Sequence, residues 1–428
     1  MNTPSDSPDV LVAGGGAAGL FSAIAAAESG ARVVVLEKNP RAGIKILMSG
    51  GSRCNITHHC DNRGIVSAYG SKGKFLHSPL ASFTTQDTID FFESEGVATK
   101  VEETGKVFPV SNRASDVLQA ILLRAERAKV DFKYSEPVTQ ISIKAGIIET
   151  VSPKGFYKPK AFILTTGGLS FPRCGTTGDG YKFAASLGHT IQPTRPALVP
   201  VAISTPWVKE LAGITVPDVK LTLSVRNNND CLNVVGSTRG SVLFTHVGIT
   251  GPCPLNLTRI EAPWEEPKSL YLEADFLPNF KSEEIAVLIQ ENSKAHGKKS
   301  IASLIAEWIP RRLVDALLSK DQLQGCKLAE LSKANRSLAI NLLKAAQLQV
   351  TGNLGYDKAE VTSGGIALEE VDFKSMRSRI HPNLFLAGEV LDLDGPIGGF
   401  NFQAAWSTGW LAGKNAAKTK NMVGENPI

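Results

Sequence analysis

The stretch DVLVAGGGAAGLFSAIAAAESGARVVVLEKN, residues 9–39, decides the fold. An apolar run over residues 10–13 predicts a strand that leads into Gly14-x-Gly16-x-x-Gly19. An alanine-rich stretch then predicts a helix, and residues 32–36 predict a second strand that ends at Glu37. A GxGxxG pattern is specific for a dinucleotide only in this order of strand, glycine turn, helix and strand.

Each residue type in this motif has a physical role. Gly14 permits the tight turn, Gly16 lets backbone N–H groups approach a pyrophosphate at the helix N-terminus, and Gly19 lets the helix pack on the strand. Glu37 is placed to accept hydrogen bonds from an adenosine ribose, and an acid there argues against a ribose 2′-phosphate. The motif therefore predicts NAD or FAD rather than NADP.

A second glycine-rich block near the C-terminus separates these two cofactors. In HPNLFLAGEVLDLDGPIGGFNFQAAWSTGWLAGKNAA, residues 381–417, we predict a buried strand over 384–387, a tight exit at Gly388-Glu389 and a glycine turn at Gly398-Gly399. Residues 402–417 have helix-forming composition, so the free N–H groups of a helix should lie beside Gly399, Phe400 and Asn401. A reduced isoalloxazine ring carries negative charge at its pyrimidine edge, so this helix end suits FAD and has no obvious purpose for NAD.

A third segment repeats the arrangement, KAFILTTGGLSFPRCGTTGDGYKFAASLGHTI, residues 160–191. We predict a strand over 162–165, a turn at Thr166-Gly167-Gly168 and a helix over 181–187. Three glycine turns that follow three apolar strands imply one sheet built from distant segments.

The bulk composition is that of a globular protein of two to three structural units. The chain has 428 residues, 43% hydrophobic and 20% charged residues, and a net charge of +5 with scattered basic residues. We therefore expect a small-molecule substrate and no nucleic-acid partner, and the oligomeric state stays open. The absence of a long apolar run and of a secretory leader favours the cytoplasm, or an organelle matrix for a trimmed chain, and no membrane.

The stretch SGGSRCNITHHC, residues 49–60, permits three interpretations. A metal site is disfavoured because the adjacent His58 and His59 would point in different directions and no second ligand pair follows, so we expect no metal. A redox disulfide between Cys54 and Cys60 is disfavoured because no second nucleotide motif accompanies it. The six cysteines contain no CxxC pair, which argues against a disulfide framework.

The favoured interpretation is a backbone loop along the flavin. Ser49, Gly50 and Asn55 are residue types expected where backbone approaches a ligand closely. Arg53 would neutralise a phosphate or an anionic substrate. Cys54 would then be a buried neighbour of the cofactor without a catalytic role.

With these segments established, the chain resembles the BaiN/YhiN-like flavoproteins, NAD(P)/FAD-dependent and aminoacetone-oxidase-like oxidoreductases within the fumarate-reductase-like flavoproteins. The resemblance covers nearly the whole chain and rests on these motifs: GGGAAGL, GIKILMSGGSRCNITH, GKVFPVSNRASDVL, TTGGLSFPRCGTTGDGY, GSVLFTHVGITGP, VTSGGIALEEVDFKSM and NLFLAGEVLDLDGPIGGFNFQAAWSTG. One departure is Ser52, where the family usually has glycine, so we expect the turn to avoid a strained dihedral there.

The resemblance implies an α/β fold with a split Rossmann-type FAD-binding domain, residues 1–190 and 355–428. It also implies an inserted β-barrel-like domain, residues 191–280 and 335–354, with a small helical subdomain at 281–334. The residue pattern agrees, because strand-like runs separated by turns occur at 198–203, 220–226, 232–235, 241–245 and 269–274. Helix-like stretches such as EEIAVLIQEN and RRLVDALLS follow from residue 282.

We predict an FAD-dependent oxidoreductase in which noncovalent FAD passes hydride to a small organic substrate, such as an activated C=C bond, with NADH or NADPH as transient donor. Alternatives are an oxidase of a small amine, an FAD-dependent tRNA-modifying enzyme and a non-catalytic flavin sensor. The predicted catalytic residues are His246 and Arg53. The predicted cofactor-binding residues are Gly14, Gly16, Ala17, Ala18, Gly19, Glu37, Lys38, Lys45, Ser49, Gly50, Arg53, Cys54, Asn55, Val138, Thr166, Gly167, Gly168, Gly388, Glu389, Gly399, Phe400 and Asn401.

Overall fold

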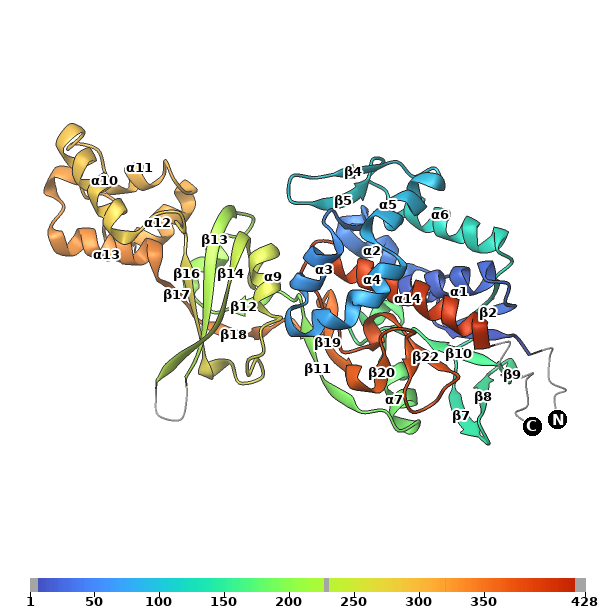
Figure 1. The fold of residues 1–428 in the computed structure, drawn as a ribbon. Coiled ribbons are helices and arrows are strands. Elements are labelled where there is room, and N and C mark those ends of the chain that lie inside the picture. Colours follow the sequence, from blue (N-terminus) through green and yellow to red (C-terminus); the bar gives the residue numbers. More distant parts are fainter. Residues whose placement is uncertain (1–6, 227–230, 320, 420–428) are drawn as a thin grey trace. The chain divides into compact units, whose positions relative to one another are not determined.

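The computed structural model describes residues 7–226, 231–319 and 321–419, and the chain divides into two compact units (Figure 1). Unit 1 comprises Met1–Pro196 and Glu360–Ile428, and unit 2 comprises Ala197–Ala359. From the sequence, residues 191–354 were expected to form an inserted β-barrel-like domain and a separate small helical subdomain. In the structure, the strands and helices of unit 2 share one hydrophobic core.

Unit 1 is built on a seven-stranded sheet with the order β20-β21-β22-β10-β1-β2-β6. The five strands from β22 to β6 run parallel, and the β20–β21 edge is antiparallel. All four residues of β1 and all five of β2 are buried, as expected for a parallel sheet covered on both faces. The strands are β1 (Val10–Ala13), β2 (Val33–Glu37), β6 (Asp131–Tyr134), β10 (Ala161–Leu164), β20 (Val371–Asp372), β21 (Arg377–Ser378) and β22 (Leu384–Leu386).

Helices α1 (Ala17–Glu28) and α14 (Phe400–Lys418) lie against each other, although they come from opposite ends of the chain (Figure 1). The approach is close because Gly409 and Gly413 lack side chains. A Cβ at Gly409 would overlap the carbonyl oxygen of Ala18, and one at Gly413 would overlap that of Ser22. The two ends of the chain are therefore joined by backbone-to-backbone packing.

The remaining elements of unit 1 cover the sheet and form three smaller sheets, β3-β5-β4, β7-β8-β9 and β11-β19. The helices are α2 (Ile44–Ser52), α3 (Asn62–Ala68), α4 (His77–Ser82), α5 (Thr85–Ser94), α6 (Ala114–Arg127) and α7 (Asp179–Ser186), with 3₁₀ turns η1 (Gly70–Leu76), η2 (Pro172–Cys174), η5 (Leu368–Glu370) and η6 (Gly388–Val390). The strands are β3 (Thr57–His58), β4 (Thr99–Val101), β5 (Lys106–Pro109), β7 (Gln140–Lys144), β8 (Ile147–Ser152), β9 (Gly155–Tyr157), β11 (Ile191–Ala197) and β19 (Val361–Ile366).

Unit 2 contains a seven-stranded antiparallel sheet with the order β17-β16-β13-β14-β15-β12-β18. Its strands are β12 (Val201–Ile203), β13 (Thr215–Arg226), β14 (Leu232–Thr245), β15 (Gly248–Thr250), β16 (Leu270–Asp275), β17 (Ala346–Leu348) and β18 (Val350–Asn353). Its helices are α8 (Pro206–Glu210), α9 (Pro252–Leu257), α10 (Ser282–Ala295), α11 (Ile301–Ile305), α12 (Arg311–Ser319) and α13 (Lys333–Lys344), with η3 (Pro267–Ser269) and η4 (Leu328–Glu330). The runs predicted at 232–235 and 241–245 form the single strand β14, because the residues between them stay paired with β13.

The predicted α/β class with a Rossmann-type domain is confirmed. The glycine-rich segments of unit 1 follow the carboxyl ends of β1, β10 and β22, which are neighbours in the sheet. Ligands of open parallel sheets bind at this edge, so the sheet brings the three predicted turns to one place.

Candidate FAD site

The first glycine turn contains one glycine that faces open space. Gly14 has φ +100°, and a Cβ there would lie 2.8 Å from the carbonyl oxygen of Thr165. A Cβ at Gly19 would overlap the carbonyl oxygen of Gly14. At Gly16, none of the described residues other than its chain neighbours has an atom within 4 Å of an added Cβ. Gly14 and Gly19 are therefore required by packing, whereas Gly16 leaves space beside the N-terminus of α1, where a pyrophosphate would bind.

Glu37 ends β2 with its side chain against the glycine turn. Its Oε2 accepts the N–H of Gly15 at 2.6 Å, and its Oε1 accepts the backbone N–H and the side-chain amide of Asn39 at 2.8 and 2.7 Å. The carboxylate is almost fully buried. A carboxylate offers about four acceptor positions, so one is left for a ribose hydroxyl.

Lys38 fixes a second loop at the end of β2. Its Nζ lies 2.7 Å from Asp179 Oδ2 and 2.7 Å from Thr177 Oγ1. Burial opposes ionisation of Asp179, but the hydrogen bonds from Lys38 and Thr177 hold the pKa of this carboxyl below its usual range. The loop that opens α7 is thereby attached to the strand that carries Glu37.

Val138 belongs to the segment that follows β6. In this segment the N–H groups of Ser135 and Glu136 donate to the carbonyl oxygens of Asn39 and Glu37, both at 2.9 Å. Val138 itself is half-buried and packs against the core of unit 1. It is therefore close along the chain to the end of β2, and its contact with an adenosine stays a prediction.

Lys45 and Glu389 form an ion pair across the site, with Nζ and Oε2 3.0 Å apart. Ser170 joins the pair, because its hydroxyl accepts from Lys45 at 2.9 Å and donates to Glu389 Oε1 at 2.6 Å. The N–H of Thr362 also donates to Glu389 Oε1, and Thr362 Oγ1 accepts the N–H groups of Leu169 and Ser170. Sequence reasoning named Lys45 and Glu389 but missed Ser170 and Thr362, although both lie within motifs that carry the resemblance, TTGGLSFPRCGTTGDGY and VTSGGIALEEVDFKSM.

The turn after β10 carries an unsatisfied polar atom. Within the described residues, the hydroxyl of Thr166 is buried and has no hydrogen-bond partner. Gly167 has φ +71°, and a Cβ at Gly168 would lie 2.5 Å from Thr362 Oγ1. Gly388, after β22, has φ +76° and packs on Ala18. A buried hydroxyl without a partner costs free energy, and this one faces Gly180 of α7, where an added Cβ would overlap Thr166 Oγ1. The contact of Thr166 with the cofactor stays a prediction.

The loop at residues 49–60 begins with a kink in α2. Ser49 has φ −70° and ψ 149°, after which Gly50, Gly51 and Ser52 have φ +56°, +67° and +66°. The expectation that the turn spares Ser52 a strained dihedral is wrong. The left-handed turn extends over this residue, and we estimate a cost of about 1–2 kcal/mol for its Cβ.

Arg53 and Cys54 differ sharply in accessibility. The Arg53 guanidinium lies 4.0 Å from the centre of the Phe108 ring, and Nη1 donates to Glu102 at 2.8 Å. Cys54 is fully buried, and burial raises the pKa of its thiol to about 12. The thiol is therefore protonated near neutral pH and a poor nucleophile.

Asn55 joins this loop to the C-terminal glycine turn. In the amide orientation that satisfies its neighbours, Oδ1 accepts the N–H of Gly399 at 2.9 Å, and Nδ2 donates to the carbonyl oxygens of Thr57 and Val107. Gly399 is the N-cap of α14, which begins at Phe400 rather than at the predicted residue 402. Asn401 bonds through its amide to Gly395, at 2.7 and 2.9 Å.

Among the described residues, no cluster of histidine, cysteine and acidic side chains is suited to a metal ion. Cys54 and Cys60 are both free thiols. His246 lies exposed in unit 2, in the turn between β14 and β15. Its catalytic role stays a prediction.

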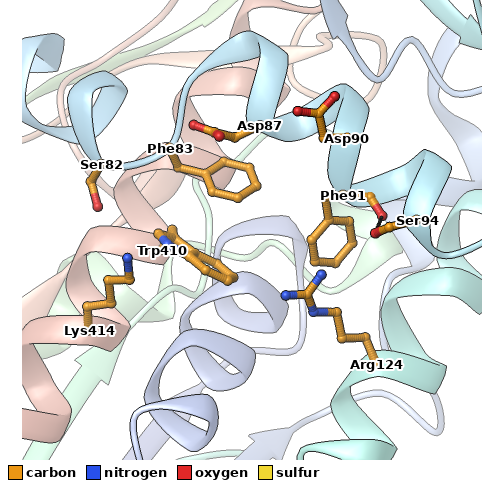
Figure 2. Close-up of a pocket in the computed structure, with 9 residues that line it drawn as sticks. All are labelled: Ser82, Phe83, Asp87, Asp90, Phe91, Ser94, Arg124, Trp410 and Lys414. Atoms are coloured by element: carbon orange, nitrogen blue, oxygen red, sulfur yellow. Dashed lines mark hydrogen bonds between the residues drawn. The ribbon is translucent and has the colours of Figure 1, made fainter.

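A separate surface groove of about 380 Å³ lies between α4, α5, α6 and α14 (Figure 2). None of the predicted site residues lines it. Figure 2 shows Arg124 and Lys414 directed toward the rings of Phe91 and Trp410, and Arg124 also pairs with Glu28 at 2.7 Å. The two cationic side chains of this groove, Arg124 and Lys414, thus already contact aromatic rings or acids of the fold.

Comparison with known proteins identifies the family. The model for the HI0933-like protein Rossmann domain matches residues 8–415. The chain belongs to this family. It is 32% identical over 418 residues to a ribosomal RNA dihydrouridine synthase of Escherichia coli, covering 96% of this chain and 99% of the relative. It is 30% identical over 412 residues to a 3-dehydro-bile acid delta(4,6)-reductase of Clostridium scindens, covering 95% and 98%.

Solved structures show the same fold at low sequence identity. An E. coli quinol fumarate reductase gives a TM-score of 0.51 at 15% identity, with 99% of this chain and 72% of that chain covered. The 3-ketosteroid delta1-dehydrogenase of Sterolibacterium denitrificans gives 0.50 at 13% identity, with 97% and 100% covered. No helix within the described residues is long and apolar enough to span a membrane. This member of the HI0933-like family is a flavoprotein oxidoreductase.

The residues at the carboxyl edge of the sheet fit FAD. Gly16 leaves the open space that a pyrophosphate requires. Lys45 uses two donor directions on Ser170 and Glu389, and an ammonium has three. Gly16 and Lys45 come from two segments that follow neighbouring strands of the sheet, β1 and β2.

Proposed function

We propose that this protein is an FAD-dependent reductase that adds hydrogen across a carbon–carbon double bond conjugated to a carbonyl group. The proposal rests on full-length similarity to two relatives whose names share this chemistry. Dihydrouridine is uridine with the ring double bond next to its C4 carbonyl reduced. In a 3-dehydro bile acid with 4,6 unsaturation, the double bonds are conjugated to the C3 carbonyl. Reduction of such a conjugated bond adds hydride to a carbon far from the carbonyl, and the enolate that results is then protonated on carbon.

Bound FAD supplies the hydride, while the protein orients the reactants and provides charge. The α1 N-terminus and Gly16 would bind the pyrophosphate, and Glu37 would accept from the ribose. Lys45 would use its third N–H toward the cofactor. The N-terminus of α14 would lie at the pyrimidine edge of the ring, where its dipole favours negative charge.

We assign Arg53 to the substrate carbonyl. Its guanidinium rests on Phe108 and donates one hydrogen bond to Glu102, which leaves further N–H groups of its planar fork for an oxygen that gains negative charge. We assign proton donation to the carbon beside the carbonyl to the imidazole of His246. We propose NADH or NADPH as the transient electron donor and a small molecule as the substrate.

A second candidate substrate is a uridine in ribosomal RNA. It is favoured by two relatives with the same name, from E. coli and from Haemophilus influenzae, of which the second is 30% identical over 414 residues. The reaction at the double bond would be unchanged, and the difference lies in how the uracil reaches the site.

The test is anaerobic mixing of the FAD-loaded protein with NADH and with NADPH, followed by substrate. We expect one nicotinamide to bleach the flavin absorbance and an α,β-unsaturated ketone to restore it, with two hydrogens gained by the ketone in mass spectrometry. Restoration by a ribosomal RNA transcript alone, with dihydrouridine formed, would instead support the second candidate. Restoration by oxygen alone would refute the reductase.

Arg53→Ala provides a residue-level test. We expect kcat/KM to fall about 100-fold, the effect of removing one donor to a developing oxyanion. Arg63→Ala, at an exposed position in α3, is the matched control and should leave kcat/KM unchanged. Equal rates for the Arg53 and Arg63 variants would contradict the assignment of Arg53.

A further inference from the structure

The side chain of Asn55 is fully engaged by backbone groups of unit 1. Its Oδ1 accepts from Gly399 N–H at 2.9 Å, and its Nδ2 donates to the carbonyl oxygens of Thr57 at 3.0 Å and Val107 at 3.2 Å. An asparagine amide has two donor hydrogens, and both have protein partners here. This arrangement leaves no side-chain N–H of Asn55 for FAD.

Gly399 needs an acceptor from another part of the chain. It is the N-cap of α14, has φ +93° and provides no side-chain cap. A Cβ at Gly399 would overlap the carbonyl group of Thr57, so the close approach of the loop excludes a side chain at this N-cap. The N–H of Gly399 itself is bound by Asn55 of the same loop.

The neighbours of Asn55 attach to the same end of α14. The carbonyl oxygen of Ile56 accepts from Trp406 Nε1 at 2.9 Å, and Thr57 Oγ1 donates to Gln403 Oε1 at 2.6 Å. His58 Nδ1 lies 3.0 Å from the carbonyl oxygen of Gly398. Four consecutive residues of the loop, 55–58, thus each bind α14 or the turn before it, and Asn55 binds the N-cap.

We infer that the side chain of Asn55 is a positioning group that holds the N-terminus of α14 at the FAD ring and is not itself a ligand of FAD. The inference rests on the proposed function in one respect, the placement of the ring's pyrimidine edge at this helix end. Reduction adds negative charge to that edge, so a fixed helix N-terminus stabilises reduced FAD more than oxidised FAD. Asn55 thereby sets the preference between the two forms.

The experiment uses Asn55→Ala in the full-length protein, with Asn62→Ala as the matched control. Asn62 lies in α3 and donates a single hydrogen bond to the carbonyl oxygen of Leu80. We measure FAD affinity, the flavin midpoint potential by spectroelectrochemistry, and hydrogen–deuterium exchange of residues 399–403 without FAD. Asn55→Ser, whose hydroxyl is too short to reach Gly399, replaces the alanine variant if that variant does not fold.

We expect Asn55→Ala to bind oxidised FAD within about twofold of the wild type but reduced FAD about tenfold more weakly, the order expected for a helix-terminus effect on a nearby anion. For a two-electron couple, a tenfold change lowers the midpoint potential by about 30 mV. Exchange at residues 399–403 should be faster than in the wild type. The Asn62 variant should match the wild type in all three measurements.

Two results would overturn the inference. If both forms of FAD lose affinity equally and exchange at 399–403 is unchanged, Asn55 is a direct ligand. If no measurement changes, it has no role at the helix end. A wild-type protein that reduces no conjugated double bond would refute the proposed function, whereas the exchange and potential shifts would still support the role of Asn55.

Discussion

Gly16→Ala separates cofactor binding from folding at the first glycine turn. Gly16 has φ −82° and ψ −170°, which alanine adopts without strain, and the added Cβ meets no protein atom within 4 Å. Removing glycine stabilises by about 0.4–1 kcal/mol through the unfolded chain. Alanine is a poorer N-cap than glycine by a similar amount, about 0.5–1 kcal/mol.

These contributions nearly cancel, so the free energy of unfolding of the FAD-free protein should change by no more than about 0.5 kcal/mol. The methyl group would however occupy the space assigned to the pyrophosphate. Displacing the phosphate by the width of a methyl group breaks at least one charged hydrogen bond, worth about 1.5–3 kcal/mol. We therefore expect the Kd for FAD to rise about 10- to 150-fold.

The assay pairs thermal unfolding of the FAD-free protein with titration of FAD by fluorescence quenching. Gly325→Ala, in unit 2, is the matched control, because no atom lies within 4 Å of its added Cβ either. The control should leave the FAD affinity unchanged. If Gly16→Ala bound FAD as tightly as the wild type, the placement of the pyrophosphate beside Gly16 would be refuted. If the Tm of the FAD-free variant were much lower, the conclusion that the protein leaves space for a methyl group at Gly16 would be refuted.

Further predictions concern stability. Ser52→Gly should raise the free energy of unfolding by about 0.5–1 kcal/mol, because relief of the strain at positive φ exceeds the entropy cost of glycine. Urea titrations measure this difference, and a loss of stability would contradict the strain at Ser52. Gly413→Ala should lower it by about 1–3 kcal/mol or more, since its Cβ overlaps the carbonyl of Ser22, and an unchanged Tm would contradict the close packing of α1 and α14. Burial lowers the pKa of His189 despite its hydrogen bond to Glu370. As the pH falls below about 6.5, His189 is therefore protonated in the unfolded chain before it is protonated in the folded protein. The free energy of unfolding should decrease as the pH falls from about 6.5 to the lowered pKa of the folded protein. His189→Gln should flatten this pH dependence in urea titrations, and an unchanged slope would exclude His189 as its source.

The local part of the fold was predictable because its signals are local. Residues 10–13 form β1, as the apolar run before the glycines predicts, and Glu37 ends β2. Each of these elements is decided by adjacent residue types. The grouping of the three glycine turns also followed, since parallel strands of one sheet present their carboxyl ends at one edge.

The hydrogen bonds within the site were not predictable in the same way. Ser170 bridges Lys45 and Glu389, and a lone serine in a turn carries no sign of such partners. Asn55 was expected at the cofactor but binds the backbone of Gly399. Residue type indicates that an amide will find partners, and only the fold decides which ones.

The wrong expectation at Ser52 has a physical cause. Serine after two glycines predicts that the left-handed conformation ends with the glycines. The loop continues it to φ +66° at Ser52, and Cys54 also has positive φ. In this conformation Arg53 binds Glu102 and Asn55 binds Gly399. Tertiary contacts outweigh a local preference of about 1–2 kcal/mol.

The packing of α1 against α14 has a consequence for synthesis of the chain on the ribosome. The bond from Trp406 to the carbonyl of Ile56 spans 350 residues of sequence. At translation rates of about 5–20 residues per second, roughly 20–70 s pass between the synthesis of Ile56 and the synthesis of Trp406 in α14. During this interval the face of α1 that Gly409 and Gly413 later cover is exposed, so the N-terminal half carries uncovered apolar surface that favours aggregation until α14 is synthesised.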